Sequence, residues 1–331
     1  MWDNLLKKMN RQVVPKLAAG LWNADISSIK LVSDGINVIY RFEKDNKGYY
    51  LRLTHQKLRS EDEIQSATSF LRHLHTNSVP VCEPILSRNN KWVEQIVDEN
   101  ETYLAHVCRE VPGVEITFAN NHESLYYNWG KSLGLFHQSS KSYKTGDYKY
   151  ATWSRSLEEL DGYIVAEDKS VQKTFETVRD YLMNKRITQD NFGLTHGDHR
   201  EANVLAKNNH VHFIDFDLPC KNWFLEDFSR PFFNPIVHDE NKWLSIFPQY
   251  LAGYFSVMPE TSLGLNEKSF LRQIQMKALE IYLWTKNNWQ GDTAPGGLNT
   301  KTWLSNIYKK IVTPSEIEII VCEALNRGIA R

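Results

Sequence analysis

The hydrophobic and polar positions in the N-terminal third of the chain change from a helical to a strand-like pattern. Over residues 1–27, apolar side chains recur every three to four positions, which predicts an amphipathic helix. Beyond this stretch, short runs of β-branched and aromatic residues are separated by turn residues such as Asp45-Asn46-Lys47-Gly48. This pattern indicates an antiparallel meander. The expected strands are residues 29–32, 37–43, 49–53, 92–97 and 102–107.

One helix is expected to interrupt these strands. Ser60 is a candidate N-cap, and Glu63 follows three residues later, which is the spacing of a capping box. Further along, Val111-Pro112-Gly113 has the composition of a boundary between domains. We therefore predict an N-terminal lobe over residues 1–110, with a leading helix, a five-stranded sheet and one inserted helix. The apolar face of the inserted helix is expected to consist of Ile64, Phe70, Leu71 and Leu74.

Helical periodicity dominates after this boundary, with one β-rich interruption at residues 194–217. This pattern predicts a larger, mainly helical C-terminal lobe over residues 111–331. The chain as a whole is expected to have an α+β fold of two lobes. The predicted helices are residues 125–139, 157–160 and beyond, 171–182, 241–255, 267–285, 300–308 and 314–325.

Composition excludes several classes of protein. Of the 331 residues, 41% are hydrophobic and 24% are charged, so the chain has enough apolar surface to form a full core. The net charge of −1 provides no basic field for nucleic acid or an anionic membrane. No apolar run reaches the 18 residues of a membrane span, and the N-terminus lacks the apolar core of a signal peptide. We expect a cytoplasmic protein that binds neither nucleic acid nor a membrane. The cysteines are expected to be free thiols, namely Cys82, Cys108, Cys220 and Cys322.

The most informative segment of the sequence lies around Asp198. Asn203 follows this aspartate after five residues, and Asp215 follows Asn203 after another twelve, at the end of an expected strand. Phosphoryl transfer explains this spacing, because one carboxylate must orient a substrate hydroxyl and accept its proton. An amide oxygen and a second carboxylate are suitable ligands for Mg²⁺ beside nucleotide phosphates. A β-hairpin is expected to bring the three side chains together.

Two short motifs carry a resemblance to a known superfamily. His196-Gly197-Asp198 with Asn203, followed by Ile214 to Asp217, resembles the motif pair of aminoglycoside phosphotransferases, choline kinases and homoserine kinases. These are small-molecule kinases of the protein-kinase-like fold. The resemblance therefore implies that residues 1–110 bind the nucleotide and that residues 111–331 carry the catalytic and substrate-binding groups. The resemblance implies ATP and Mg²⁺ as cofactors, Asp198 as the catalytic base, and Asn203 and Asp215 as magnesium ligands. It also implies a buried structural role for Asp227. The element order resembles the superfamily over nearly the whole chain, but the motifs are specific only within residues 194–228.

The N-terminal lobe departs from the pattern that the resemblance implies. The loop at residues 33–37 takes the place of the phosphate-covering loop but has a single glycine, Gly35, and a plain β-turn fits it equally well. Arg52 stands where the family has a phosphate-binding lysine. The alternative for Arg52 is an exposed strand residue. Ala67 occupies the usual position of the glutamate partner, so Glu63 is the best remaining acid, unless it only caps its helix.

The segment from Tyr103 to Gly113 resembles the last strand and hinge of the N-terminal lobe in this superfamily. By that resemblance, the backbone of Arg109, Glu110 and Val111 would bind adenine. Four further side chains lie in or near the motifs. His196 and His137 are expected to brace the structure rather than to take part in chemistry, whereas His199 and Arg200 are either solvated or face the substrate.

The acceptor pocket is expected in the helical lobe, where an aromatic stripe either belongs to the core or offers cation–π contacts to an amine. We predict an ATP- and Mg²⁺-dependent phosphotransferase that acts on an alcohol group of a small molecule, which is amino alcohol-like, homoserine-like, choline-like or aminoglycoside-like. A protein Ser/Thr kinase and a catalytically idle binding or assembly protein are the alternatives. The oligomeric state is open. The candidate pocket residues are Phe232, Asn234, Asp239, Glu240, Tyr282, Trp284 and Trp289.

Overall fold

The computed structural model describes residues 5, 8–116, 123–238, 242–289, 291–293 and 298–329. The chain divides into two compact units. Unit 1 comprises residues 1–113, 143–150 and 212–217, and unit 2 comprises residues 114–142, 151–211 and 218–331. Among the described residues, none of the helices has the length and apolar character needed to span a bilayer.

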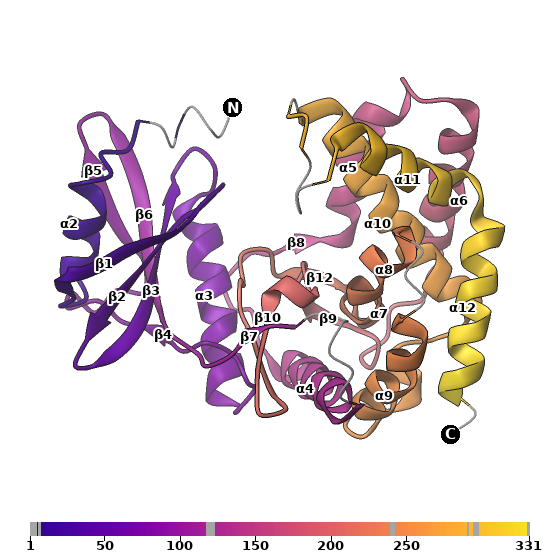
Figure 1. Ribbon diagram of the computed structural model, residues 1–331, viewed down its shortest axis with the longest axis horizontal. Helices are drawn as coiled ribbons and strands as arrows, with labels where there is room; N and C mark the ends of the chain where they lie inside the picture. The colour runs from indigo at the N-terminus through magenta and orange to yellow at the C-terminus, as the bar shows by residue number, and fades with distance from the viewer. Residues whose placement is uncertain are drawn as a thin grey trace. The chain divides into compact units, whose positions relative to one another are not determined.

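Unit 1 is built around a six-stranded antiparallel sheet (Figure 1). The strand order is β1-β2-β3-β6-β4, and β5 also pairs with β6. The hairpin between β2 and β3 turns at Asp45 and Asn46, whose φ angles of 52° and 57° suit residues that tolerate the left-handed region. The strands are β1 (Asp25–Asp34), β2 (Val38–Lys44), β3 (Lys47–His55), β4 (Pro84–Ile85), β5 (Glu94–Asp98) and β6 (Glu101–Arg109).

The sequence predicts five of these six strands. The sixth, β4, has only two residues and is too short to produce an alternating pattern. The predicted helix over residues 1–27 is wrong in its extent, because residues 11–13 form turns, α2 spans only Val14–Gly20, with Pro15 in its first turn, and β1 begins at Asp25. The chain leaves α2 through Asn23, which has a φ of 57°.

The helix α3 (Glu61–Thr76) begins as its sequence predicts. The Ser60 hydroxyl accepts a hydrogen bond from the Glu63 N–H at 3.2 Å, and the Glu63 carboxylate accepts one from the Ser60 N–H at 2.8 Å. This capping box satisfies two N–H groups that the first turn leaves unpaired. The predicted apolar face of α3 is buried at Ile64, Phe70, Leu71 and Leu74.

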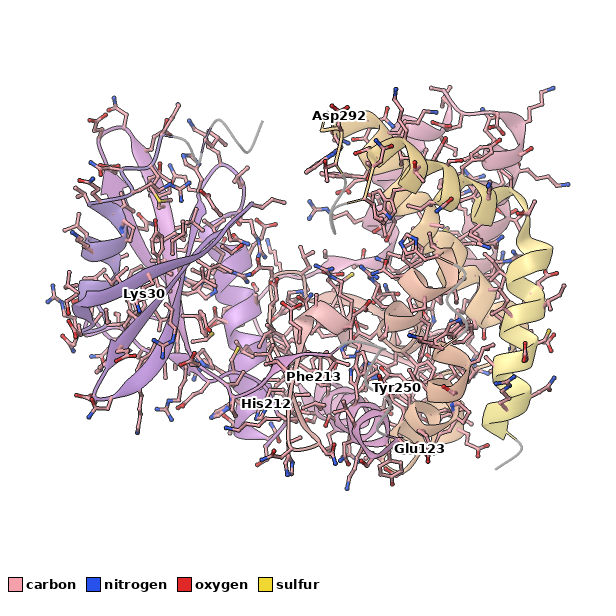
Figure 2. All side chains as sticks on the ribbon, in the orientation of Figure 1. Lys30, Glu123, His212, Phe213, Tyr250 and Asp292 are labelled. Carbon is pink, nitrogen blue, oxygen red and sulfur yellow. The ribbon has the colours of Figure 1, made fainter. Side chains whose placement is uncertain are left out.

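Two short segments far along the chain also belong to unit 1. Phe213, labelled in Figure 2, forms a parallel bridge with Val81, and its N–H donates to the Pro80 carbonyl at 2.8 Å. In the other segment, the Tyr150 hydroxyl donates to the Ser66 carbonyl of α3 at 2.7 Å. Residues 212–217 are therefore packed with the N-terminal sheet although they follow it by more than a hundred positions.

Unit 2 is mainly helical, with short strands around the segment that carries the motifs. β9 (Phe192–Thr195) pairs with β12 (Cys220–Trp223), β12 pairs with β8 (Ala151–Thr152), and β10 (Val204–Lys207) pairs with β7 (Val114–Glu115). The strand β11 (His210–Phe213) continues from unit 2 into unit 1. The helices are α4 (Glu123–Ser142), α5 (Trp153–Ile164), α6 (Lys169–Met183), α7 (Phe224–Ser229), α8 (Phe233–Val237), α9 (Trp243–Phe255), α10 (Glu267–Asn288), α11 (Thr300–Val312) and α12 (Pro314–Ile329).

The helices α4 and α9 pack with their backbones in contact. A Cβ atom on Gly130 would lie 1.9 Å from the Tyr250 carbonyl oxygen, and one on Gly253 would lie 1.9 Å from the Tyr127 carbonyl oxygen. Only glycine allows this approach. The crossing holds Trp129 in edge-to-face contact with Tyr250, with ring centroids 5.4 Å apart. Tyr250 is labelled in Figure 2. The two rings form one wall around the loop that follows β9.

Candidate active site

The loop that follows β9 is held in place by a buried carboxylate. Asp227, in α7, accepts hydrogen bonds from the N–H groups of His196 at 2.7 Å and Gly197 at 3.2 Å. Gly197 has a φ of 82°, and a Cβ atom there would lie 2.0 Å from the Leu218 carbonyl oxygen. The tight turn before Asp198 therefore requires both the glycine and the buried acceptor.

His137 completes the support for Asp227. The His137 Nε2 lies 3.2 Å from Asp227, and its Nδ1 lies 2.9 Å from the Tyr254 hydroxyl. Burial lowers the pKa of His137, so the neutral ring donates from Nε2 and accepts at Nδ1. Burial by itself would raise the pKa of Asp227, but the hydrogen bond from His137 outweighs this effect and lowers the pKa below its ordinary value. His137 thus braces the loop from a fully buried position.

Asp198 lies at the centre of a cluster of donors within unit 2. The Arg230 Nη2 donates to its Oδ1 at 3.0 Å, and the Arg200 Nε donates to its Oδ2 at 3.1 Å. The Asn203 amide donates to the Asp198 carbonyl at 2.8 Å and to its Oδ2 at 3.1 Å. Burial would raise the pKa of Asp198, but the charges of Arg230, Arg200 and Lys277 lower it to about 2. Asp198 is therefore ionised at neutral pH and fixed in orientation.

Arg230 was missed by the sequence analysis. It begins a 3₁₀ turn three residues after Asp227, and its side chain is only 8% exposed. Its Nε and Nη1 are buried and have no hydrogen-bond partner among the described residues. A basic residue in the apolar run that follows Asp227 is the one signal in the sequence that points to a buried guanidinium.

His199 lies inside the protein rather than on a solvated or substrate-facing surface. It is 1% exposed, and its Nε2 accepts a hydrogen bond from the Trp129 indole N–H at 2.9 Å. Burial lowers the pKa of His199 to about 3, so the ring is neutral at physiological pH. Both roles considered for His199 from the sequence are therefore wrong, while its neighbour Arg200 faces Asp198.

Asp215 and Arg52 are paired within unit 1. Both terminal nitrogens of Arg52 donate to the Asp215 Oδ1 at 2.9 Å, and Nη1 also donates to Asp217 at 2.5 Å. The Arg52 side chain is 12% exposed, so the alternative of an exposed strand residue is wrong. Burial opposes the charge of Arg52, but the two carboxylates more than compensate and raise its pKa. Asp215 adopts a left-handed φ of 65°, which turns its side chain back toward β3.

The remaining candidates of unit 1 have different environments. Glu63 caps α3, and the carboxylates that contact Arg52 are those of Asp215 and Asp217. Gly35 lies in the bend between β1 and β2, where its N–H donates to the Asn37 carbonyl at 3.1 Å. The structure therefore does not bring Glu63 to Arg52.

Among the described residues, one of the three N–H groups in the predicted hinge makes no hydrogen bond. The N–H groups of Arg109 and Glu110 already donate to the carbonyls of Glu83 at 2.8 Å and Gly48 at 3.0 Å. Within the part of the chain that the structure describes, the Val111 N–H makes no hydrogen bond. The side chains of Arg109 and Glu110 are also engaged, in ion pairs with Glu83 and Arg41 respectively. Of the three hinge residues, Val111 is thus the one whose N–H is open to a ligand.

The donors predicted for a metal ion are chemically suitable for Mg²⁺. The Asn203 amide directs its nitrogen to Asp198, which leaves its oxygen for a cation. The Asp215 Oδ2 makes no hydrogen bond within the described residues, while Oδ1 binds Arg52. No group of three or more His, Cys, Asp or Glu residues suited to a metal exists among the described residues. Two oxygen donors of this kind fit Mg²⁺, which completes its shell with phosphate oxygens and water.

Of the acceptor candidates of unit 2 that the structure describes, two are buried in the core. Phe232 is buried against Phe247 and Tyr250, and Tyr282 is 8% exposed. Trp284 is 43% exposed, and the Trp289 indole donates to a backbone carbonyl at 3.2 Å. The Asn234 amide lies 3.5 Å from a carboxylate oxygen of Glu201. Asp239 and Glu240 lie outside the described residues.

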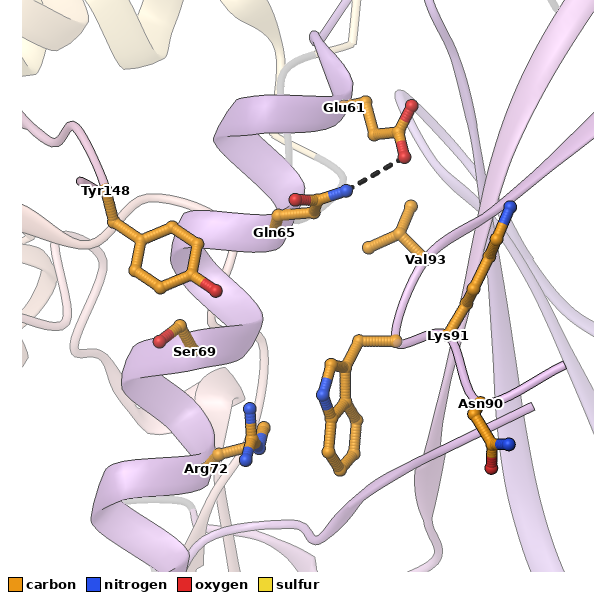
Figure 3. Close-up of a pocket in the computed structure, with 9 residues that line it drawn as sticks. Glu61, Gln65, Ser69, Arg72, Asn90, Lys91, Val93 and Tyr148 are labelled. Carbon is orange, nitrogen blue, oxygen red and sulfur yellow. Dashed lines mark hydrogen bonds between the residues drawn. The ribbon is translucent and has the colours of Figure 1, made fainter. Parts of the chain in front are cut away.

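A separate pocket of about 230 Å³ lies in unit 1, between α3 and residues 90–93 (Figure 3). The guanidinium of Arg72 covers the Trp92 ring at 4.2 Å from its centroid. Apart from these two side chains, the lining is mainly polar and includes none of the predicted site residues. The other lining residues are Glu61, Gln65, Ser69, Asn90, Lys91, Val93 and Tyr148.

The fold and the loop at Asp198 define a phosphotransferase of the kinase type with an alcohol acceptor. The model of the phosphotransferase enzyme family matches residues 28–262, and the chain belongs to this family. The predicted α+β fold, with an antiparallel N-terminal sheet and a helical C-terminal region, is confirmed. The predicted class, a small-molecule kinase, is confirmed as well.

The chain is also similar to individual small-molecule kinases. Over 247 residues the chain is 28% identical to amicoumacin kinase of Bacillus subtilis (strain 168). The aligned region covers 72% of this chain and 74% of the relative. The solved structure of amicoumacin kinase hAmiN in complex with AMP-PNP, Ca²⁺ and Ami superimposes with a TM-score of 0.82 at 24% identity, over 96% of this chain and 97% of that one. A microcompartment-associated aminopropanol kinase gives a TM-score of 0.69 at 16% identity, over 95% and 98%.

Proposed function

We propose that this protein transfers the γ-phosphoryl group of ATP, with Mg²⁺, to a hydroxyl of an amine-bearing small molecule of the amicoumacin type. The observation that carries the proposal is the fixed Asp198 carboxylate, held by Arg230, Arg200 and Asn203 beside the Asp227 brace. Amicoumacin kinase is the relative that supports the acceptor class, at 28% identity. The AMP-PNP and Ca²⁺ of the hAmiN complex support a nucleotide with a divalent cation.

In this proposal Asp198 orients the acceptor hydroxyl and takes its proton. A carboxylate whose pKa is about 2 is a weak base, so it accepts the proton only late, as the new bond to phosphorus forms. Its main contribution is orientation, since three donors prevent the carboxylate from rotating. A bound Mg²⁺ would supply charge neutralisation for the phosphates, and Asn203 and Asp215 would hold it. Arg52 would bind phosphate oxygens through its planar fork.

The nucleotide would be held by groups of unit 1. The Val111 N–H is the open donor for the adenine edge. The bend that contains Gly35 would cover the phosphates. The backbone makes both contacts, which explains why neither leaves a side-chain signature in the sequence.

The proposal is tested by incubating the purified protein with ATP and Mg²⁺ and one acceptor at a time. The acceptors are amicoumacin, aminopropanol, choline, homoserine, an aminoglycoside and casein as a generic protein substrate. We expect the mass of amicoumacin to increase by one phosphoryl group, and an Asp198→Asn variant to lack this activity. Phosphorylation of casein alone would indicate a protein kinase, and absence of ATP binding would indicate an idle family member. Either result would overturn the proposal.

A further inference from the structure

The bend between β1 and β2 is fastened by a single amide. The Asn37 Nδ2 donates to the Asp217 Oδ2 at 2.5 Å, and the Thr54 hydroxyl donates to the Asn37 Oδ1 at 2.5 Å. Both ends of the amide are therefore occupied, one by β3 and the other by the segment that follows β11. An amide held at both ends keeps one orientation, and the bend at Gly35 is held with it.

The carboxylate that receives Asn37 is also the meeting point of two arginines. The Asp217 Oδ1 accepts from the Arg52 Nη1 at 2.5 Å and lies 3.4 Å from the Arg59 Nη1. The side chains of Asp217, Arg52 and Arg59 are 17%, 12% and 15% exposed. Charge-assisted hydrogen bonds with so little access to water are stronger than neutral ones on the surface.

Asp217 differs in this respect from Asp215, two residues earlier. Both oxygens of Asp217 are occupied by protein donors, whereas Asp215 uses only Oδ1. Asp217 is therefore poorly placed to serve as a metal ligand. Its bonds instead join three parts of unit 1, namely the bend, strand β3 and the segment that carries Asp215.

We propose that Asp217 is a positioning residue that holds the β1–β2 bend in its nucleotide-binding conformation through Asn37 and orients Arg52 toward the phosphates. The inference rests on the proposed function, because it assumes that ATP binds beneath this bend. Removing Asp217 would release the amide and leave Arg52 to bind Asp215 alone. Both consequences weaken ATP binding without touching Asp198 or its partners.

The test is a double-mutant cycle read by calorimetric titration of ATP in the presence of Mg²⁺, which needs no acceptor. We expect Asn37→Ala to raise the Kd for ATP about 5-fold and Asp217→Ala about 10-fold or more. Because the two residues act through one bond, the double variant should be no weaker than Asp217→Ala alone. Asp34→Ala is the matched control, since this aspartate lies beside the same bend but pairs with Arg11 at the surface, 51% exposed. It should leave the Kd unchanged.

An exchange of the two side chains provides the stricter test. Asn37→Asp places two carboxylates in contact and should weaken ATP binding at least as much as Asn37→Ala. Adding Asp217→Asn restores one donor and one acceptor across the same contact, and it should recover at least part of the lost affinity. This pair also serves if Asp217→Ala does not fold. Recovery is an outcome that a merely structural role for each residue would not produce.

Three results would overturn the inference. The first is additive effects of Asn37→Ala and Asp217→Ala on the Kd. The second is an exchanged pair no better than Asn37→Asp. The third is a loss confined to the Mg²⁺-dependent part of ATP binding in Asp217→Ala with Asn37→Ala silent, which would make Asp217 a metal ligand. Failure of the proposed function gives a different result: in an idle family member the wild-type protein would bind no ATP, and in a protein kinase the wild-type protein would phosphorylate casein while the cycle of ATP affinities stayed as expected.

Discussion

At the scale of single residues, the chemistry of the site depends on how a few charges are neutralised. Asp198 is ionised in spite of its burial because Arg230 and Arg200 contact its two oxygens. Asp227 is held differently, because a neutral histidine and two backbone N–H groups donate to its buried carboxylate. Each aspartate is thereby fixed as an acceptor with a defined orientation, and orientation is a major part of catalysis in phosphoryl transfer.

Replacing Asp198 by asparagine keeps the shape of the side chain and removes its charge. We expect kcat to fall by about 10²–10⁴, the range for loss of a general base. The Kd for ATP should change little, because the proposed nucleotide contacts lie in unit 1. Steady-state kinetics with the phosphorylated acceptor and calorimetry with ATP measure the two quantities. Turnover close to that of the wild type would contradict the assignment.

The pH dependence of the reaction tests the role of Arg230. The pKa of Asp198 in the folded protein is about 2, below its ordinary value of 3.8, so the stabilising effect of its charge is complete above pH 3.8 and is lost as the pH falls toward 2. Arg230→Met removes the larger of the cationic contributions and should move the acid limb of kcat/KM to higher pH. The pH–rate profiles of wild type and variant show this directly. Arg155→Met, at an exposed helical pair, is the control and should leave the profile in place.

At the scale of elements, the site depends on how α4 meets α9. The crossing places Trp129 and Tyr250 against His199. In unit 1, by contrast, the capped N-terminus of α3 and the β2–β3 hairpin are fixed by contacts between residues close together in the chain. Both glycines at the crossing lie closer to backbone oxygens than any side chain permits. The loop at Asp198 therefore depends on a contact between helices that are distant in sequence.

Gly130→Ala introduces a methyl group 1.9 Å from the Tyr250 carbonyl oxygen. We expect the free energy of unfolding to fall by about 1–3 kcal/mol or more, the cost of overpacking a close contact. Gly162→Ala, in α5, is the matched control because no atom lies within 4 Å of its added Cβ. That change should be neutral or stabilise by up to about 1 kcal/mol. Urea unfolding of both variants measures the difference, and equal effects would disprove the close crossing.

At the scale of the whole molecule, the candidate residues are divided between the two compact units. Unit 1 supplies Arg52, Asp215 and Asp217, and unit 2 supplies Asp198 and Asn203. In each unit the candidate residues are held by partners of the same unit. A ligand that binds the folded protein and not the unfolded chain should stabilise the fold by mass action.

Nucleotide with metal should stabilise the protein more than nucleotide alone. At a free concentration of 100 Kd, ATP with Mg²⁺ should add about 2.7 kcal/mol to the free energy of unfolding. EDTA should remove much of the accompanying rise in Tm. In Asp215→Ala, the rise in Tm caused by ATP should no longer depend on Mg²⁺. Thermal-shift titrations of wild type, Asp215→Ala and Asp198→Asn separate these effects. An equal rise in Tm with EDTA and with Mg²⁺ would rule out the metal role of Asp215.

The sequence by itself determined the parts of this protein that local patterns encode. Alternation of apolar residues located β2, β3, β5 and β6, and the spacing of Ser60 and Glu63 located the start of α3. The motif from His196 to Asn203 identified the loop because its glycine, aspartate and asparagine lie at a specific spacing within eight residues. In each case the physical cause acts between neighbours along the chain, so that composition and spacing are sufficient to reveal it.

Only the tertiary structure decided which charges meet. Arg52 binds Asp215 across 163 positions, Asn37 binds Asp217 across 180, and Arg230 reaches Asp198 across 32. Glu63, for which the sequence left open a pairing with Arg52 or a helix cap, caps its own helix, and His199 is buried against Trp129. Pairing of this kind depends on how the sheet and helices pack and on which carboxylate then lies within reach of a buried cation. No periodic pattern in the sequence indicates which charges pair, because the contact energy is gained only after distant segments have folded together.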